Sequence, residues 1–244
     1  MNNTSNTINS PEKAPTSATK PHSIILIHGL YQNRFIMKTL GNRLAKLGYE
    51  IHYYDYPTLR NKIADNADAF AQYLTQLETP YTIIGHSLGC LVTYFAVRKL
   101  IEAPDSLHSQ CILPHSIIAI TPPFKGSRIV EYLSENHSGF LVGKSEEILR
   151  PSDNIPAWNF PIPLGVIAGT HNSGPSALLL EKWANRLPKD SLTGDGTVYI
   201  DETKIAGIQD FITLPKTHTM ILFDRDLPQL CHQFITTGFF SVDP

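Results

Sequence analysis

Tyr81-Thr82-Ile83-Ile84-Gly85-His86-Ser87-Leu88-Gly89 is the most informative segment of the chain. Its first half is a short run rich in β-branched residues, which is typical of a buried strand. Its second half is a Gly-x-Ser-x-Gly pentapeptide that opens an apolar segment with the pattern of a helix. A strand, a sharp turn and a helix in this order predict an elbow that holds the oxygen of Ser87 clear of the sheet edge. The competing interpretation is an ordinary tight turn in which Ser87 only caps the helix.

Strand-like and helix-like segments alternate along most of the chain. Residues 23–27 precede a helical pattern over 35–47 that Gly48 is placed to end, and residues 50–54 precede another over 63–77. The remaining strand candidates are residues 116–120, 164–168 and 211–214. This alternation predicts βαβ units and an α/β fold with a mainly parallel sheet.

Two segments depart from the alternation. Residues 1–21 are polar and nearly free of large apolar side chains, which predicts a disordered tail. Residues 122–163 are interrupted by proline and glycine, are only moderately apolar and have poor strand character. Because a long insertion in a compact domain is often a lid or a binding loop, we expect a lid or cap over 122–163 within one domain spanning 22–244.

Composition excludes several classes of protein. A formal net charge of -2 does not fit nucleic-acid binding, and there is no polybasic run for an anionic membrane. No stretch reaches the ~20 apolar residues of a membrane span, and the first twenty residues lack the apolar core of a secretory signal. Cys90, Cys111 and Cys231 are odd in number and widely spaced, so we expect reduced thiols and a cytoplasmic location.

A serine hydroxyl needs a base to accept its proton, and His218 is the strongest candidate for that base. It lies in a loop directly after the last predicted strand, so it should share the sheet edge with the elbow. His171 also follows a strand end and is the main rival. His232 falls in a predicted C-terminal helix, where a structural role is expected.

The base in turn needs a carboxylate to orient it, and Asp195 stands between two glycines in Gly194-Asp195-Gly196-Thr197-Val198. Flanking glycines permit a tight turn that presents a carboxylate inward. Asp-Gly is also a common turn at a loop tip, so turn chemistry alone leaves the two interpretations even. Asp190, Asp201 and Asp210 are the alternatives, with Asp153 a weaker one.

Two backbone N–H groups are expected to stabilise a developing oxyanion, and loss of one such donor typically costs ~3 kcal/mol. One is the amide of Leu88, directly after the serine, and the other is the amide of Leu30, in the loop after residues 23–27. A plain turn at the strand end is the alternative for that loop. Around this centre we place a substrate pocket formed by His28, Gly29, Tyr31, His86, Phe124 and His171.

With these residues assembled, the chain from Ile24 to Phe223 resembles bacterial lipases and esterases of the α/β-hydrolase superfamily, in particular triacylglycerol lipases and the lipase-like relatives of GPI-inositol deacylases. His28-Gly29-Leu30 is similar to the lipase His-Gly oxyanion motif, and Gly85–Gly89 to the family's nucleophile elbow. Residues 121–127 are similar to a Thr-Pro-His-x-Gly-Ser segment, with Pro123-Phe124 where Pro-His is usual. Gly194–Val198 is similar to Asp-Gly-Thr-Val, whose Asp is the triad acid, and this favours Asp195. The resemblance implies an α/β-hydrolase fold with a modest lid or cap insertion after the sixth strand.

These residues predict a carboxylic-ester hydrolase that works through an acyl-enzyme on Ser87, with His218 as base, Asp195 as acid and a small-molecule acyl ester as substrate. This chemistry requires no metal or organic cofactor. Many relatives are secreted lipases, but the absent signal and the moderately apolar insertion favour an esterase for smaller acyl substrates. Acyl transfer, thioester hydrolysis and a non-catalytic binding protein on the same fold remain the alternatives.

Overall fold

A six-stranded, all-parallel sheet forms the centre of the computed structural model, which describes residues 22–102, 111–151, 157–173 and 193–241. The strand order is β2-β1-β3-β4-β5-β6, and every neighbouring pair is parallel. The strands are β1 (Ser23–Ile27), β2 (Glu50–Tyr54), β3 (Tyr81–His86), β4 (Ser116–Ile120), β5 (Leu164–Gly169) and β6 (Asp210–Leu214). The predicted α/β class and its parallel sheet are therefore confirmed.

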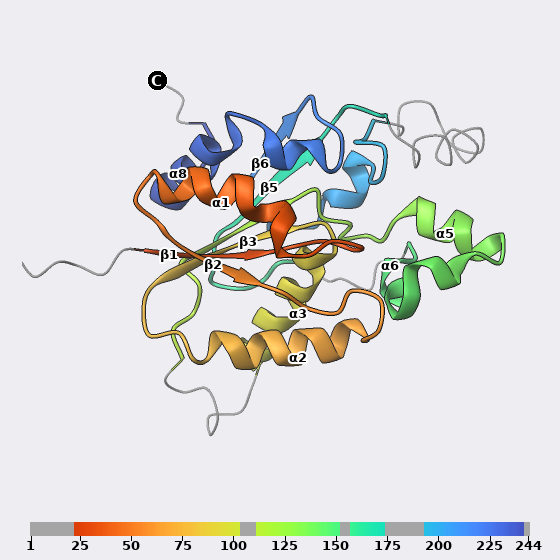
Figure 1. Ribbon diagram of the computed structural model, residues 1–244, viewed down its shortest axis with the longest axis horizontal. Coiled ribbons are helices and arrows are strands. Elements are labelled where there is room, and N and C mark those ends of the chain that lie inside the picture. The colour runs from red at the N-terminus through yellow and green to blue at the C-terminus, as the bar shows by residue number, and fades with distance from the viewer. Residues whose placement is uncertain (1–21, 103–110, 152–156, 174–192, 242–244) are drawn as a thin grey trace, which may run out of the picture.

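Helices cover both faces of this sheet (Figure 1). The 3-10 turn η1 (Arg34–Met37), α1 (Lys38–Ala45) and α8 (Leu227–Thr237) lie over one face, and α2 (Ile63–Leu74) and α3 (Leu88–Glu102) lie over the other. Each face has its own apolar cluster. The helix expected over 35–47 begins as a 3-10 turn and ends at Ala45, and the one expected over 63–77 ends at Leu74.

Burial on both faces explains why β1, β3, β4 and β5 read as nearly continuous apolar runs. All five residues of β1 are buried, and β1 pairs with β2 on one side and β3 on the other. The edge strands β2 and β6 are only partly buried, which agrees with their more polar sequences. Because all six strands run the same way, their carboxyl ends meet at one edge of the sheet.

The insertion expected over residues 122–163 forms helical turns in its described part and contains no strand there. It includes α5 (Arg128–Glu135), the 3-10 segment η2 (Gly139–Ser145) and α6 (Glu146–Leu149), which lie together beyond one end of the sheet (Figure 1). It follows β4 rather than a sixth strand, because only four strands of the described chain precede it. Two more 3-10 turns, η4 (Ile200–Thr203) and η5 (Met220–Phe223), flank β6.

The predictions for the tail, for membrane-spanning segments and for the cysteines can be compared with the described residues only in part. The tail predicted over 1–21 lies outside them. Among the described helices, none combines the length and the apolar character needed to cross a bilayer. The three cysteines are free thiols, and Cys90 and Cys231 are buried.

We predict that Gly89→Ala destabilises the fold although alanine is the better helix former. A methyl group at Gly89, in the first turn of α3, would lie 2.5 Å from the carbonyl oxygen of His28 and 2.7 Å from that of Ile27. Helix propensity alone would stabilise the variant by about 1 kcal/mol, whereas overpacking against rigid backbone typically costs about 1–3 kcal/mol. Urea unfolding measures the sign. A variant as stable as the parent, or more stable, would contradict the close approach of α3 to the loop after β1.

Candidate active site

Ser87 occupies a strained turn between β3 and α3. Its φ is +52°, in the left-handed region that costs a non-glycine residue of order 1–3 kcal/mol. The N–H of Ser87 donates to the carbonyl of Ile120 at the end of β4 (2.9 Å), and its own carbonyl accepts from the N–H of Cys90 (2.9 Å). The predicted strand–turn–helix elbow is therefore present, with the side chain of Ser87 at the carboxyl edge of the sheet.

His218 reaches Ser87 from the loop after β6. Its Nε2 lies 2.9 Å from the Oγ of Ser87, although the two residues are 131 positions apart in sequence. The backbone of this loop is held as well, because the N–H of His218 donates to the carbonyl of Asp195 (2.9 Å). Both the ring of His218 and the backbone that carries it are therefore held by hydrogen bonds.

Asp195 holds the other nitrogen of that imidazole. Its Oδ2 lies 2.7 Å from Nδ1 of His218, and its Oδ1 accepts the N–H groups of Thr197 (2.9 Å) and Val198 (2.8 Å). Gly196 adopts a φ of +90°, and a methyl group there would lie 2.5 Å from the carbonyl oxygen of Ser173, so this turn requires glycine. The Asp-Gly turn therefore directs the carboxylate of Asp195 inward, where only 1% of the residue is exposed. It is not an exposed turn at a loop tip.

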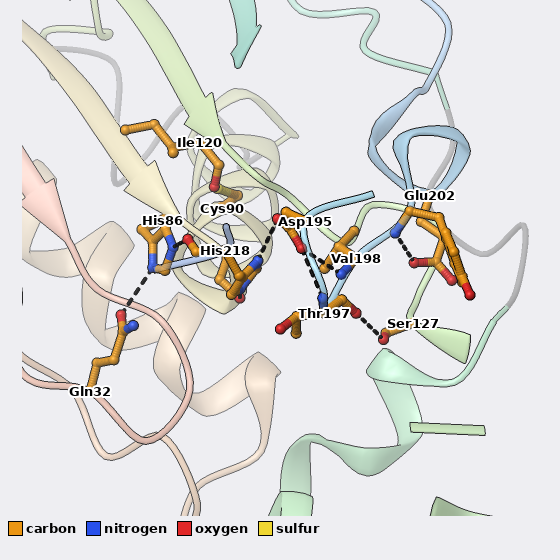
Figure 2. Close-up of polar contacts among 12 residues, drawn as sticks. Gln32, His86, Cys90, Ile120, Ser127, Asp195, Thr197, Val198, Glu202 and His218 are labelled. Carbon is orange, nitrogen blue, oxygen red and sulfur yellow. Dashed lines mark hydrogen bonds and ion pairs between the residues drawn. The ribbon is translucent and has the colours of Figure 1, made fainter. Parts of the chain in front are cut away.

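These three side chains form a directed proton path. With Nδ1–H donated to the carboxylate of Asp195, the lone pair of Nε2 is free to accept the hydroxyl proton of Ser87. Figure 2 shows His218 between Asp195 on one side and His86 on the other. Such an arrangement can activate a serine nucleophile and then stabilise the imidazolium that forms.

The alternative acids and bases lie elsewhere. Asp201 forms a bidentate ion pair with Arg128 (2.9 and 2.6 Å), and Asp210 accepts the N–H of Phe240 (2.6 Å). His232 lies in α8 and pairs with the hydroxyl of Tyr49, as expected for a structural residue. Asp153 and Asp190 fall outside the described residues.

The two amides expected to bind an oxyanion both belong to residues that line a cavity beside Ser87. Among the described residues, neither the N–H of Leu30 nor that of Leu88 donates to another protein group. The loop that carries Leu30 is anchored at its start, where the hydroxyl of Tyr56 donates to the carbonyl of His28 (2.8 Å). Tyr31 follows with a φ of +59°, a second strained position next to the site.

Ser87 lines a cavity of about 290 Å³ whose walls are mainly apolar. The insertion supplies much of its surface from α5, η2 and α6. The lining residues from these three elements are Ile129, Val130, Leu133, Val142 and Leu149, and Pro123 and Ser127 line the cavity from the chain before them. The insertion expected to be a lid or cap therefore forms a wall of the candidate site.

Of the six residues predicted for the pocket, Tyr31 lies on its wall, with 62% of its surface exposed, and five do not. His28 is buried, stacked on Tyr56 at 4.7 Å between ring centroids, and Gly29 lies behind Ser87. His86 is fully buried beside His218. The side chain of Phe124 turns into the apolar core, while its neighbour Pro123 reaches the cavity. His171 is exposed, because the loop after β5 is bound by its backbone to Lys216 instead of turning toward the cavity.

Two residues with polar contacts at the site, Gln32 and Glu202, belong to no recognisable sequence pattern. Gln32 lines the cavity and bonds to the backbone of Gly29 and to the ring of His86, but a single glutamine in a loop carries no pattern. Glu202 is 3% exposed and accepts the N–H groups of Arg128 (2.8 Å) and Tyr199 (2.7 Å). Glu202 thereby joins the first turn of α5 to the loop that carries Asp195.

Within the described residues, no group of three or more His, Cys, Asp or Glu side chains is arranged to hold a metal ion.

The chain is similar in structure to proteins of a known fold. No protein-family model and no curated protein sequence matches the chain. Among solved structures, the chain is similar to the mature lipase BlEst2 of Bacillus licheniformis, with a TM-score of 0.67, 18% identity and coverage of 91% of this chain and 95% of that chain. It is similar to the phospholipase PlaB of Legionella pneumophila, with a TM-score of 0.54, 16% identity and coverage of 75% and 45%. It is also similar to the thioesterase RedJ of Streptomyces coelicolor, with a TM-score of 0.51, 14% identity and coverage of 95% and 96%. The chain therefore has the α/β-hydrolase fold.

Burial raises the pKa of Glu202 from the ordinary 4.5 to about 8, against the opposing effect of its N–H donors and Arg128. Since the folded state then binds this proton more tightly than the unfolded state, stability should fall as the pH rises from about 4.5 to about 8. We predict that the melting temperature of the parent declines over this window relative to that of Glu202→Gln, which has no titrating group there. Thermal unfolding at pH 5, 6, 7 and 8 measures the difference. A difference that is flat, or that grows in favour of the parent, would mean that the N–H donors outweigh burial.

Proposed function

We propose that the protein is a serine hydrolase that cleaves carboxylic esters through an acyl-enzyme on Ser87. The observation that carries this proposal is the contact of three side chains from three separate loops. The hydroxyl of Ser87 lies 2.9 Å from His218, and His218 lies 2.7 Å from the buried carboxylate of Asp195, at the mouth of an apolar cavity. A turn that only caps a helix would not require a histidine and a carboxylate aligned behind the serine.

In the proposed acylation step, the oxygen of Ser87 attacks the acyl carbon while Nε2 of His218 takes its proton. The carbonyl oxygen becomes an oxyanion between the amides of Leu30 and Leu88. When the intermediate collapses, the bond to the leaving alcohol breaks and His218 donates the proton to that alcohol. Asp195 holds the imidazolium throughout.

Deacylation repeats these steps with water in place of Ser87. His218 takes a proton from water, the resulting hydroxide attacks the acyl-enzyme, and the same two amides stabilise the second oxyanion. The acid product leaves, and the proton returns to Ser87.

The cavity supports a substrate with an apolar acyl chain of short to medium length. Its volume of about 290 Å³ lies at the lower end of the range for small-molecule sites, and its walls are largely aliphatic. An ester of a small or soluble acyl group therefore fits better than a long triglyceride chain.

Thioester hydrolysis is the second candidate, because RedJ, named a thioesterase, shares the fold over nearly its whole length. A thioester uses the same triad and differs only in its leaving group. Matched oxygen and thioester substrates with one acyl chain distinguish the two, through the ratio of their kcat/KM values.

We predict that Ser87→Ala and Asp195→Asn abolish most hydrolysis of a p-nitrophenyl acyl ester. Loss of a triad member removes the proton path, and an Asp→Asn change at this position favours the wrong imidazole tautomer, so kcat should fall by about 10⁴-fold. Asp210→Asn, whose carboxylate lies outside the triad, is the matched control and should keep parental activity. Parental protein that neither hydrolyses esters nor labels at Ser87 with a fluorophosphonate would favour a non-catalytic binding protein.

We predict that acyl-chain preference follows the cavity wall. On a panel of p-nitrophenyl esters of increasing length, the parent should prefer short to medium chains, and Leu133→Phe should shift this preference to shorter ones. One methylene in an apolar pocket changes kcat/KM by about 10- to 200-fold, so the longest accepted ester should lose at least about tenfold. Leu141→Phe, at an exposed position of η2 off the cavity wall, is the control. Highest activity on long emulsified triglycerides would overturn the assignment to an esterase.

A further inference from the structure

The ring of His86 lies between the loop that carries Leu30 and the loop that carries His218. Its Nε2 is 2.9 Å from the backbone carbonyl oxygen of His218, and its Nδ1 is 2.9 Å from Oε1 of Gln32. Figure 2 shows the ring between these two partners, beside the end of β3. His86 directly precedes Ser87 in the sequence, so one rigid segment carries both the nucleophile and this ring.

Gln32 extends the same contacts to the other side of the site. Its Oε1 also accepts the N–H of Gly29 (2.9 Å), and its own backbone N–H donates to the carbonyl of Gly29 (3.3 Å). Gly29 is bonded covalently to Leu30, whose amide is one of the two oxyanion donors of the proposed function. The side chain of Gln32 therefore closes the turn that sets the direction of the Leu30 N–H.

Charge explains why a buried histidine is suitable at this position. Burial, together with the neighbouring His218, lowers the pKa of His86 to about 3, so the ring is neutral at ordinary pH. A neutral imidazole has one N–H, and both of its partners are oxygen acceptors, so the ring donates to only one of them. The other ring nitrogen lies in close contact with its partner oxygen without a hydrogen bond. With its centroid 5.0 Å from the ring of His218, a neutral His86 supports the backbone of that loop without repelling the imidazolium that forms during catalysis.

We propose that Gln32 and His86 are positioning residues, which join the oxyanion loop to the loop of the catalytic base through one chain of polar contacts. The chain runs from the Gly29 amide through Gln32 and His86 to the His218 carbonyl. It sets the distance between the Leu30 amide and the imidazole, which act on opposite sides of the same acyl carbon. This inference depends on the proposed serine hydrolase activity and adds two residues to it.

The test uses Gln32→Met, which keeps the length of the side chain but removes its acceptor, together with His86→Phe and the double variant. Each single variant has a matched control away from the site. Gln209→Met breaks a glutamine bond to the Gly238 carbonyl (2.8 Å), and His115→Phe breaks a histidine bond to the Ile235 carbonyl (3.0 Å). Four quantities are measured: kcat and KM on the best ester, inhibition by a trifluoromethyl ketone of the same chain length, and inhibition by the corresponding alcohol.

The trifluoromethyl ketone reports the oxyanion geometry directly. Ser87 adds to its carbonyl carbon, the hydroxyl proton passes to His218, and the ketone oxygen becomes an oxyanion at the two amides. The alcohol occupies only the apolar cavity. We expect Gln32→Met to lower kcat and ketone affinity by about 10- to 100-fold, as misplacement of a catalytic group does, while KM and alcohol affinity stay within about twofold. The double variant should lose no more than about threefold beyond the worse single variant, because both substitutions break one chain.

Three results would overturn the proposal while the parental esterase stays active. One is parental kcat and ketone affinity in Gln32→Met. Another is an equal loss of ketone and alcohol affinity, which indicates general damage to the cavity. The third is single losses that multiply in the double variant, which indicates independent roles. Because Gln32 lies in a partly exposed loop, its variant tests the proposal even if His86→Phe does not fold. An inactive parental protein would instead count against the proposed function itself.

Discussion

The left-handed backbone of Ser87 is the constraint on which the rest of the site depends. The strand before it and the helix after it are joined without a spacer, so the serine must turn sharply where the parallel strands end. The turn is held by a bond to the end of β4 and by the absence of a side chain at Gly89, where α3 touches the carbonyl groups of Ile27 and His28. That contact brings the start of α3 beside the loop after β1. The amides of Leu88 and Leu30, which are distant in sequence, therefore come together as a consequence of packing one helix against one strand end.

Around this turn, polar contacts form an almost continuous line across the sheet edge. From one side they pass through Gln32 and His86 to the backbone of His218, and from the other through Asp195 to the amides of Thr197 and Val198. Figure 2 shows the labelled members of this line. The two sides differ in charge, because a ring kept neutral by burial lies on one side of His218 and a carboxylate on the other. This asymmetry directs the proton of Nδ1 toward the carboxylate and leaves Nε2 facing the serine.

The parts of this arrangement that sequence reasoning predicted are those with local signals. A β-branched run before Gly-x-Ser-x-Gly, an Asp between glycines and a His after the last strand are each readable in a few residues, and a parallel sheet places all strand ends at one edge. The lining of the cavity has no such local signal. Phe124 and Pro123 are neighbours, yet one enters the core and the other reaches the cavity, and only the packing of the insertion determines which. Gln32 and Glu202 form hydrogen bonds with residues far away in the sequence or with backbone groups of loops. Such contacts leave no periodic pattern in the sequence.

The junction between the insertion and the loop of Asp195 limits which parts of the cavity wall can change in sequence independently of Asp195. The first turn of α5 is bound to that loop through Glu202, Asp201 and the hydroxyl of Ser127, so changes there disturb the acid as well as the cavity wall. The far part of the wall, formed by Leu133 and Val142, takes no part in these bonds, whereas Leu149 is tied to the root because its carbonyl accepts the N–H of Ser127 (2.8 Å). If the protein has the proposed function, selection or engineering for a new acyl group can therefore remodel the distal half of the cap and leave the contacts of Asp195 and His218 unchanged, whereas exchange of the entire cap has to include the residues that anchor its root.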